Sequence, residues 1–321
     1  MKKILVTGAC GYIGTRLCKH LAENGYSITA FDSFDPSNYS RWVSLMENVI
    51  IGDIRDEKTL NKIVREEYDV VVHLISLDHH KSENNPNLVS SINVMPTWNL
   101  LHRLTKNNLK KFIYLSTIHV YGRIPNKIIT ENYTPAPHNT YGLTHLLSEN
   151  ICNYYNLKTE TDCINVRLSN SYGSPVFNEN NCWWLVVNDL CKQAFMKKKI
   201  ELLSDGSPLR DFIHISDICR AVELLIKADK KDLKKNIYHI SSGKTLTILD
   251  LAFIVKMEYK NHFNQDINII SSDKSIQTNP DKYLHLDKYT IDNSSLREFG
   301  FLPKIDLKTG INEIFDYLQE N

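Results

Sequence analysis

Hydrophobic and polar positions follow two different periods in the first half of the chain. Short runs rich in β-branched and aromatic residues are separated by longer stretches in which apolar residues recur every three or four positions. This succession predicts a parallel sheet covered by helices, because parallel strands are joined by crossovers that are usually helical. The run VVVHLI at 70–75 is apolar almost throughout, as expected of a strand buried on both faces.

The pattern predicts six strands and four helices in this half, in the order of a doubly wound α/β fold. The strands are predicted at Lys3–Thr7, Ser27–Phe31, Val49–Ile51, Val70–Leu74, Lys111–Ser116 and Asp162–Arg167. The helices are predicted at Tyr12–Glu23, Glu57–Arg65, Asn93–Lys106 and Thr140–Tyr155.

The rhythm changes after Arg167. The stretch 171–181, SYGSPVFNENN, is rich in turn-forming residues, and a helix is predicted at Trp183–Met196. Strand character returns at 237–243, and the tail beyond Tyr259 is polar and irregular, with a closing helix at Asp306–Glu320. We therefore expect two lobes. The first comprises 1–168 plus 212–258, and the second, smaller one comprises 169–211 plus 259–321.

Composition narrows the class of protein. The 321 residues are 42% hydrophobic, which is enough for a large core. The 38 basic and 37 acidic side chains give a net charge of +1 without a basic stripe, which argues against a nucleic-acid partner. Seven cysteines, none spaced as C-x-x-C, argue against a disulfide framework and a zinc site. With no signal peptide and no apolar run of ~18 residues, we expect a cytoplasmic protein that does not span a membrane.

A glycine-rich loop follows the first strand. TGACGYIG places Gly8, Gly11 and Gly14 where the next helix begins. The backbone must approach a pyrophosphate closely at such a site, and a helix N-terminus then supplies free N–H groups and a positive potential. A glycine motif alone is weak evidence, but here a strand precedes it and a helix follows it. The loop predicts dinucleotide binding.

Two acidic residues refine this prediction. Asp32 ends the second strand, where a carboxylate can accept both hydroxyls of an adenosine ribose and would repel a 2′-phosphate. The cofactor is therefore predicted to be NAD rather than NADP. Asp53 ends the third strand, and there are two interpretations of it. It either bonds an adenine amino group or caps the helix that begins near Glu57.

Further motifs follow in a fixed order. They are VVHLIS, NVMPTWNLL, FIYLSTIHVYG, TYGLTHLLSE, VRLSNSYG, PLRDFIHISDI and LREFGFLP. With the glycine loop they resemble, almost from end to end, the extended short-chain dehydrogenase/reductase family in its nucleotide-sugar epimerase and dehydratase branch. The resemblance implies a Rossmann domain with a smaller substrate-binding lobe. It also implies NAD as cofactor and a nucleoside-diphosphate sugar as substrate.

The resemblance implies a role for individual residues. Thr117 and Tyr141 fall on the family's catalytic threonine and tyrosine, with His145 beside them, and Thr117, His119, Asn170 and Arg210 are implied to contact the substrate. The residues implied to bind NAD are Gly8, Gly11, Tyr12, Ile13, Gly14, Asp32, Asp53, Ile54, Leu74, Ile75, Asn93, Tyr141, His145 and Leu168.

One position departs from the family pattern. His145 lies where the family has a lysine, which lowers the pKa of the catalytic tyrosine and bonds the nicotinamide ribose. Four residues beyond Tyr141 on one helix face, a histidine can form the same hydrogen bond. Its pKa near ~6.5 leaves it mostly neutral at pH 7, so it replaces the charge only in part. We therefore expect a working enzyme that is slower or has a shifted pH dependence.

The residues beside Thr117 bear on the reaction. The family's 4,6-dehydratases have Asp and Glu there, whereas Ile118 and His119 follow Thr117 here, which disfavours dehydration. His119 is either a second acid/base group or a loop residue bonded to backbone. Two kinds of enzyme that oxidise C4 of the sugar are left open: a 4-epimerase and a dehydrogenase that releases the 4-keto-sugar. Either would act on a hexose or heptose in the synthesis of bacterial surface polysaccharide. A protein of another class, a non-catalytic NAD(H)-binding sensor or scaffold, is the third interpretation.

The family resemblance also bears on the ligands of the protein and on its oligomeric state. Adjacent histidines rarely point at one ion, so LDHHKSENNP at 77–86 is expected to contact sugar or phosphate rather than a metal. Lys282 is the nearest substitute for a second diphosphate-binding arginine, and GDP or UDP is favoured on family frequency alone. The pair Trp183–Trp184 is expected to pack in the smaller lobe. Relatives pair through the helices predicted at Asn93–Lys106 and Thr140–Tyr155, which implies a homodimer.

Overall fold

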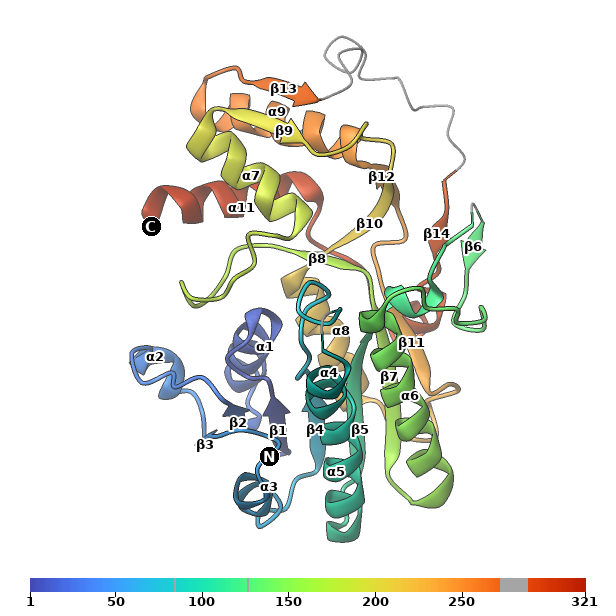
Figure 1. Ribbon diagram of the computed structural model, residues 1–321. Coiled ribbons are helices and arrows are strands. Elements are labelled where there is room, and N and C mark those ends of the chain that lie inside the picture. The colour runs from blue at the N-terminus through green and yellow to red at the C-terminus, as the bar shows by residue number, and fades with distance from the viewer. Residues whose placement is uncertain (84, 126, 272–287) are drawn as a thin grey trace. The chain divides into compact units, whose positions relative to one another are not determined.

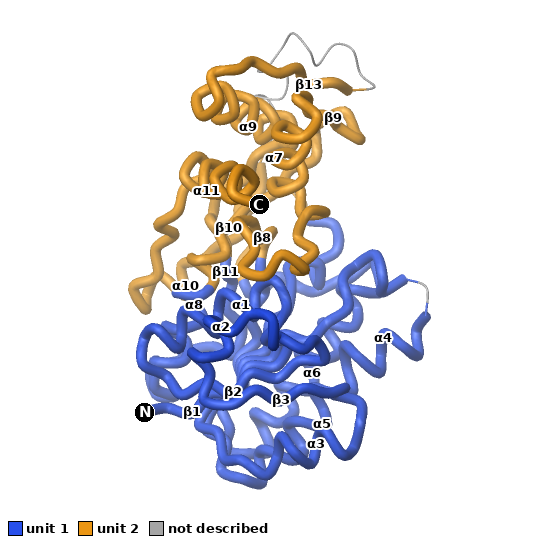
Figure 2. Tube along the Cα trace, turned by 90° about the vertical axis from the view of Figure 1, so that its left-hand side faces the viewer, with its two compact units in different colours: residues 1–124, 131–168, 219–240 blue, residues 125–130, 169–218, 241–321 orange. Residues whose placement is uncertain are grey.

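The computed structural model describes residues 1–83, 85–125, 127–271 and 288–321, and the chain divides into two compact units (Figure 2). The first unit comprises residues 1–124, 131–168 and 219–240. The second comprises residues 125–130, 169–218 and 241–321. Both divisions have a boundary after residue 168, but residues 125–130, 212–218 and 241–258, predicted in the first lobe, belong to the second unit.

A parallel sheet of seven strands forms the centre of the first unit (Figure 1), in the order β11-β7-β5-β4-β1-β2-β3. The order reverses at β1, which pairs with β2 on one side and β4 on the other. The predicted doubly wound fold is thus confirmed, and the six predicted strands are each found within one residue of their limits. The strands are β1 Lys3–Thr7, β2 Ser27–Asp32, β3 Asn48–Ile51, β4 Val70–His73, β5 Lys111–Thr117, β7 Asp162–Leu168 and β11 Ile237–Ile240.

Helices cover both faces of this sheet. On one face Leu5, Val71 and Phe112 share a buried cluster with side chains of α3, α5 and α6, and α5 and α6 lie in front of the sheet in Figure 1. On α1 and α8, His20 and Glu223 are joined by a contact of 2.8 Å. The helices are α1 Tyr12–Glu23, α2 Ser40–Val43, α3 Glu57–Ile63, α4 Pro86–Asn93, α5 Met95–Leu104, α6 Thr140–Lys158 and α8 Ile215–Lys227, with 3₁₀ turns η1 Thr105–Asn107 and η2 Ile118–Tyr121.

Asn93 ends a helix instead of opening one, which corrects the prediction. It is the last residue of α4, and α5 begins two residues later with Pro96 in its first turn. Proline has no N–H and its ring clashes with the preceding turn, so a helix can begin there but cannot run through it. Val94, between the two helices, has φ −115° and ψ −56°.

The second unit has small sheets and a helical core of its own. Side chains of α7, α9 and α11, among them Leu190, Val255 and Ile314, form one buried cluster, which explains why residues 248–258 belong here. Its strands are β6 Ile128–Ile129, β8 Asn170–Tyr172, β9 Lys199–Leu202, β10 Leu209–His214, β12 Thr245–Thr247, β13 Asn268–Ser271 and β14 Thr290–Ile291. Its helices are α7 Val186–Lys197, α9 Ile248–Phe263, α10 Ser294–Arg297 and α11 Leu307–Glu320.

The second unit also differs from the predicted elements. The helix expected from Trp183 begins at Val186. Of the tryptophan pair, Trp183 packs against the helical core, whereas Trp184 is 40% exposed. The tail beyond Tyr259 contains β13, β14 and α10 in addition to the predicted closing helix. Across the ranges that the structure describes, no helix is long and apolar enough to cross a membrane.

Candidate active site

The glycine loop forms a tight turn between β1 and α1. Gly8 has a φ of +75°, which side-chain-bearing residues rarely adopt. A Cβ on Gly14 would lie 2.0 Å from the Gly8 carbonyl oxygen, so only glycine fits there. Gly11 is the N-cap of α1, and Tyr12 and Ile13 form its first turn, with no acidic residue among them. The turn thus presents backbone and a helix N-terminus, as a pyrophosphate requires.

Asp32 connects the end of β2 to this turn. Its Oδ2 accepts a hydrogen bond of 2.9 Å from the Cys10 N–H, and its Oδ1 accepts one of 3.1 Å from the Phe34 N–H. A carboxylate oxygen accepts more than one hydrogen bond, so both retain capacity for ribose hydroxyls. The glycine turn and Asp32 together fit the adenosine diphosphate half of NAD.

Asp53 does not cap α3, which excludes one of its two interpretations. Asp56 occupies the N-cap position of that helix. Asp53 instead accepts hydrogen bonds from the Arg55 N–H, at 2.9 Å, and from the Arg55 guanidinium, which lowers the pKa of its carboxyl group. Ile54 is buried in the core cluster of the first unit. An adenine contact by these two residues stays a prediction.

Residues expected to line the nicotinamide side differ in their surroundings. Leu74 follows β4 and its N–H donates to the Thr7 carbonyl at 3.0 Å, while a Cβ on Gly8 would lie 3.1 Å from the Ile75 nitrogen. The backbone after β4 therefore lies against the glycine turn. The Asn93 side chain is fully buried, and its Oδ1 accepts from the Leu77 N–H at 2.8 Å. Leu168 is the last residue of β7.

Two capping contacts fix the start of α6. The Asn139 side chain accepts a hydrogen bond of 2.8 Å from the Gly142 N–H. Glu83, from the loop after β4, accepts from both the N–H and the hydroxyl of Thr140, at 3.0 and 3.1 Å. A carboxylate is also favoured at a helix N-terminus by the helix dipole. Tyr141 is consequently the second residue of a helix whose start is held on two sides.

Thr117 and Tyr141 come together as predicted. Thr117 is the last residue of β5, and its side chain is hydrogen-bonded to that of Tyr141. Thr117 Oγ1 already accepts from the His119 N–H at 3.2 Å, which leaves its own hydrogen for the Tyr141 phenol oxygen. Burial raises the pKa of Tyr141 to about 12, against the lowering effect of this hydrogen bond.

His145 lies beside Tyr141, with its ring edge toward the phenol ring at a centroid distance of 4.5 Å. Its Nδ1 is 2.8 Å from the Tyr114 hydroxyl and its Nε2 is 3.1 Å from Ser76 Oγ. Burial, with small contributions from His119 and His73, lowers the pKa of His145 to about 3. The imidazole is therefore neutral and supplies no positive charge to the phenol.

His119 also lies against the phenol ring. Its ring and that of Tyr141 meet edge to face with centroids 5.6 Å apart, and the His79 ring is stacked with it at a centroid distance of 6.5 Å. His79 and His80 contact each other at 3.9 Å. Within the described part of the chain, no three His, Cys, Asp or Glu side chains are arranged to hold a metal ion.

The residues expected at the diphosphate belong to the second unit, where they are described by their local contacts. Asn170 donates from Nδ2 to the Asp211 carbonyl at 2.9 Å. Arg210 is exposed on β10, and its guanidinium donates to the Leu209 carbonyl at 2.8 Å. Lys282 lies outside the described residues.

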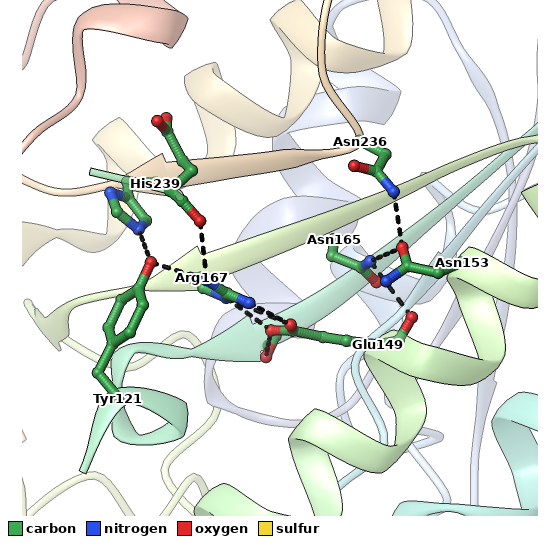
Figure 3. Close-up of polar contacts among 9 residues, drawn as sticks. Tyr121, Glu149, Asn153, Asn165, Arg167, Asn236 and His239 are labelled. Atoms are coloured by element: carbon green, nitrogen blue, oxygen red, sulfur yellow. Dashed lines mark hydrogen bonds and ion pairs between the residues drawn. The ribbon is translucent and has the colours of Figure 1, made fainter. Parts of the chain in front are cut away.

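A buried polar network continues from the catalytic strand and was missed from the sequence. Ser116, next to Thr117, donates to Glu149 at 2.6 Å, and Glu149 forms a buried ion pair of 2.7 Å with Arg167 on β7. Arg167 also donates to the Tyr121 hydroxyl at 2.8 Å, and Tyr121 contacts His239 (Figure 3). The other missed residues are Ser76, Glu83 and Tyr114. Only Asn139, a capping residue before a helix, had a recognisable signal.

Comparisons with known proteins identify the family of the chain. Residues 4–241 match the model of the NAD dependent epimerase/dehydratase family. A putative UDP-glucose 4-epimerase of Methanocaldococcus jannaschii is 26% identical over 321 residues, covering 99% of each chain. A dTDP-glucose 4,6-dehydratase of Streptomyces niveus is 25% identical over 332 residues, covering 99% of this chain and 93% of the relative.

A solved structure extends the likeness to the fold. UDP-glucuronic acid 4-epimerase from Bacillus cereus, in complex with UDP-glucuronic acid and NAD, superposes with a TM-score of 0.79. The two chains are 25% identical, and the match covers 99% of each. The family resemblance and the NAD cofactor predicted from the sequence are thereby confirmed. The chain belongs to the NAD-dependent epimerase/dehydratase family.

Proposed function

We propose that the protein is a nucleotide-sugar 4-epimerase, in which Tyr141 takes a proton from the C4 hydroxyl of the sugar. The observation that carries this proposal is the hydrogen-bonded pair of Thr117 and Tyr141 at the end of β5. The 4-epimerases named among the relatives support the position of the reaction on the sugar. NAD, when bound, supplies the hydride acceptor and a positively charged nicotinamide ring.

Tyr141 must become a base for this reaction. Its pKa of about 12 makes it a phenol at neutral pH. Thr117 favours the phenolate by donating a hydrogen bond to it, and a nearby cation would favour it further. Because His145 is neutral, we infer that it positions the phenol through ring contact and leaves the cationic role to the bound cofactor.

The same proposal names the residues that would bind the cofactor and the substrate. Gly8, Gly11 and Gly14 would receive the pyrophosphate at the start of α1, and Asp32 the adenosine ribose. Arg210 is the proposed partner of the substrate diphosphate, because its exposed fork of N–H groups suits two phosphate oxygens at once. We propose a UDP-sugar, since the named 4-epimerase relatives act on UDP-sugars.

A 4,6-dehydratase is the second candidate, and His119 is the observation in its favour. His119 lies edge-on to Tyr141 and is a second group able to transfer a proton beside the sugar. Against it, Ile118 occupies the preceding position, is buried and has no proton to give. We favour epimerisation over release of a keto-sugar. In epimerisation the hydride returns from NADH to C4, so no second substrate is needed to regenerate NAD.

A panel of substrates tests the proposal. Purified protein is mixed with NAD and UDP-, GDP-, dTDP- or CDP-sugars, nicotinamide absorbance is followed, and products are identified by mass spectrometry and NMR. Epimerisation gives a UDP-sugar of unchanged mass with inverted C4, and Tyr141→Phe lowers the rate at least ~100-fold. A keto-sugar with accumulating NADH would indicate a dehydrogenase, and loss of water a dehydratase. Cofactor binding without any turnover would overturn the enzymatic proposal.

We also propose that the protein is a homodimer that pairs through α5 and α6. Apolar side chains are exposed at helical spacing on both helices, at Met95 and Trp98 on α5 and at Leu143, Leu147 and Tyr154 on α6. Exposed apolar patches of this kind are typical of protein interfaces. The two helices pack side by side, so their exposed residues are well placed to form one continuous surface.

A further inference from the structure

Both nitrogens of His145 are engaged by side chains that the family pattern did not single out. The Tyr114 hydroxyl, on the middle of β5, lies 2.8 Å from Nδ1. Ser76 Oγ, from the segment after β4, lies 3.1 Å from Nε2. The imidazole ring is thus held between β5 and the segment that follows β4, and a rotation of the ring would break both contacts.

The direction of one hydrogen bond determines the direction of the other. A serine hydroxyl has a single hydrogen, and that of Ser76 is donated to the Leu77 carbonyl at 2.9 Å. Ser76 Oγ therefore accepts from His145, which places the imidazole hydrogen on Nε2. Nδ1 is then an acceptor, and the Tyr114 hydroxyl donates to it.

The surroundings of His145 oppose a second proton on the ring. Its side chain is buried, which disfavours a charged ring, and the titratable groups that act on it, His119 from η2 and His73 from β4, lower its pKa further. Tyr141, on the same helix, meets it edge-on through its ring. Tyr114 is itself buried, and its hydroxyl also contacts the Ser148 side chain, whose own hydrogen is donated to the Asn93 carbonyl at 2.8 Å.

We propose that Tyr114 and Ser76 hold His145 as a neutral imidazole protonated on Nε2, and that Tyr114 is a positioning residue for the catalytic tyrosine through His145. This inference deepens the proposed function and rests on it for its catalytic part. Its structural part concerns the apo protein alone. At this position His145 thus presents an oriented hydrogen-bond donor that carries no charge.

Nitrogen NMR of the apo protein labelled with ¹⁵N-histidine tests the structural part. Loss of one set of ring signals in His145→Gln assigns His145. At pH 7 the assigned ring should have a protonated Nε2 and an unprotonated Nδ1, and should keep this form down to pH 5. A ring protonated on Nδ1, or on both nitrogens, would overturn the proposal, whatever the protein does to sugars.

Tyr114→Phe tests the positioning role. It should shift the His145 nitrogen signals and lower kcat about tenfold with KM for the UDP-sugar unchanged, the size expected for one hydrogen bond to a neutral group. The matched control Tyr68→Phe removes a buried tyrosine hydroxyl elsewhere in the same core cluster and should leave both readouts unchanged. Unchanged His145 signals in Tyr114→Phe would overturn the role of Tyr114. If no sugar is turned over by the native protein, the proposed function fails while the NMR result still decides the tautomer.

Discussion

At the scale of single residues, the proposed site has His145 where the family resemblance implies a lysine, and a histidine there needs different partners. A lysine in place of His145 would bring a charge, three donors and a long flexible stem. Histidine brings a rigid ring, and Tyr114 and Ser76 are each hydrogen-bonded to one of its two nitrogens. Burial raises the pKa of Tyr141 to about 12, and the hydrogen bond with Thr117 acts against this.

Replacing His145 by lysine should move the pH dependence of activity. An ammonium group beside Tyr141 would lower the phenol pKa by roughly 1–3 units, so the rising limb of kcat/KM against pH should shift to lower pH by that amount. Steady-state rates measured from pH 5 to 10 give the shift. His145→Gln, which offers a neutral donor, is the matched control and should keep the native midpoint. Identical profiles for the native and lysine proteins would show that residue 145 does not act on Tyr141.

Individual site residues were predictable only where a motif names them. Thr117 and Tyr141 were found because the ordered motifs place them in register, and the structure joins them. Ser76 and Tyr114 were not found, since a serine and a strand tyrosine carry no signal until their partner is known. The capping role of Asp53 was wrong because sequence spacing could not tell it from Asp56, three residues later.

At the scale of elements, α6 carries most of the site and is held at three levels. Glu83 and Asn139 fix its start, and His145 is bonded to β5 one turn later. A further turn on, Glu149 accepts a hydrogen bond from Ser116. Glu149 also forms an ion pair with Arg167 (Figure 3). Because Ser116 precedes Thr117, this last contact sets the register between the strand and the helix that present the catalytic pair.

Breaking the buried ion pair should be costly. Glu149→Gln leaves the Arg167 guanidinium buried without its counter-charge, and we expect the free energy of unfolding to fall by about 3–5 kcal/mol. Urea titration followed by circular dichroism measures this. Glu57→Gln is the control, because Glu57 is the exposed partner in an ion pair with Arg103. This variant should lower the free energy of unfolding by under about 1 kcal/mol. Equal losses in the two variants would contradict the importance of the buried pair.

Elements were predictable to the extent that local pattern determines them. The strands of the parallel sheet stood out because burial on both faces makes them continuous apolar runs. The break between α4 and α5 was missed because Pro96 fits a helix start as well as a helix stop. The helix α9 was absent from the predicted elements and its region was assigned to the first lobe, since helical periodicity does not say which core a helix packs against.

At the scale of the whole molecule, the exposed apolar residues of α5 and α6 predict self-association. Trp98→Glu combined with Leu147→Glu places two charges on this surface and should convert a dimer into monomers at micromolar concentration. Analytical ultracentrifugation gives the mass. Leu203→Glu, at a fully exposed apolar residue of the second unit, is the control and should leave the mass unchanged. A native protein that sediments as a monomer would refute the proposed dimer.

Stability against acid is the other property that belongs to the whole molecule. His73 and His145 are buried, and burial lowers the pKa of each to about 3 from the ordinary 6.5. Between these values the unfolded chain binds more protons at the two histidines than the folded protein does. The free energy of unfolding therefore falls as the pH drops below 6.5, by about 2 kcal/mol per histidine at pH 5. Above pH 6.5 both are neutral in either state and the contribution is fully present.

His145→Gln isolates half of this effect. The variant should lose about 2 kcal/mol less than the native protein between pH 7 and pH 5, as measured by urea unfolding at each pH. His102→Gln, at an exposed histidine on α5, should show the native dependence. A His145→Gln protein that loses stability as steeply as the native one would mean that His145 is able to take up a proton in the folded state. In that case His145 would be able to act as a cation beside Tyr141. A stability measurement without cofactor or sugar therefore tests whether residue 145 supplies a positive charge there.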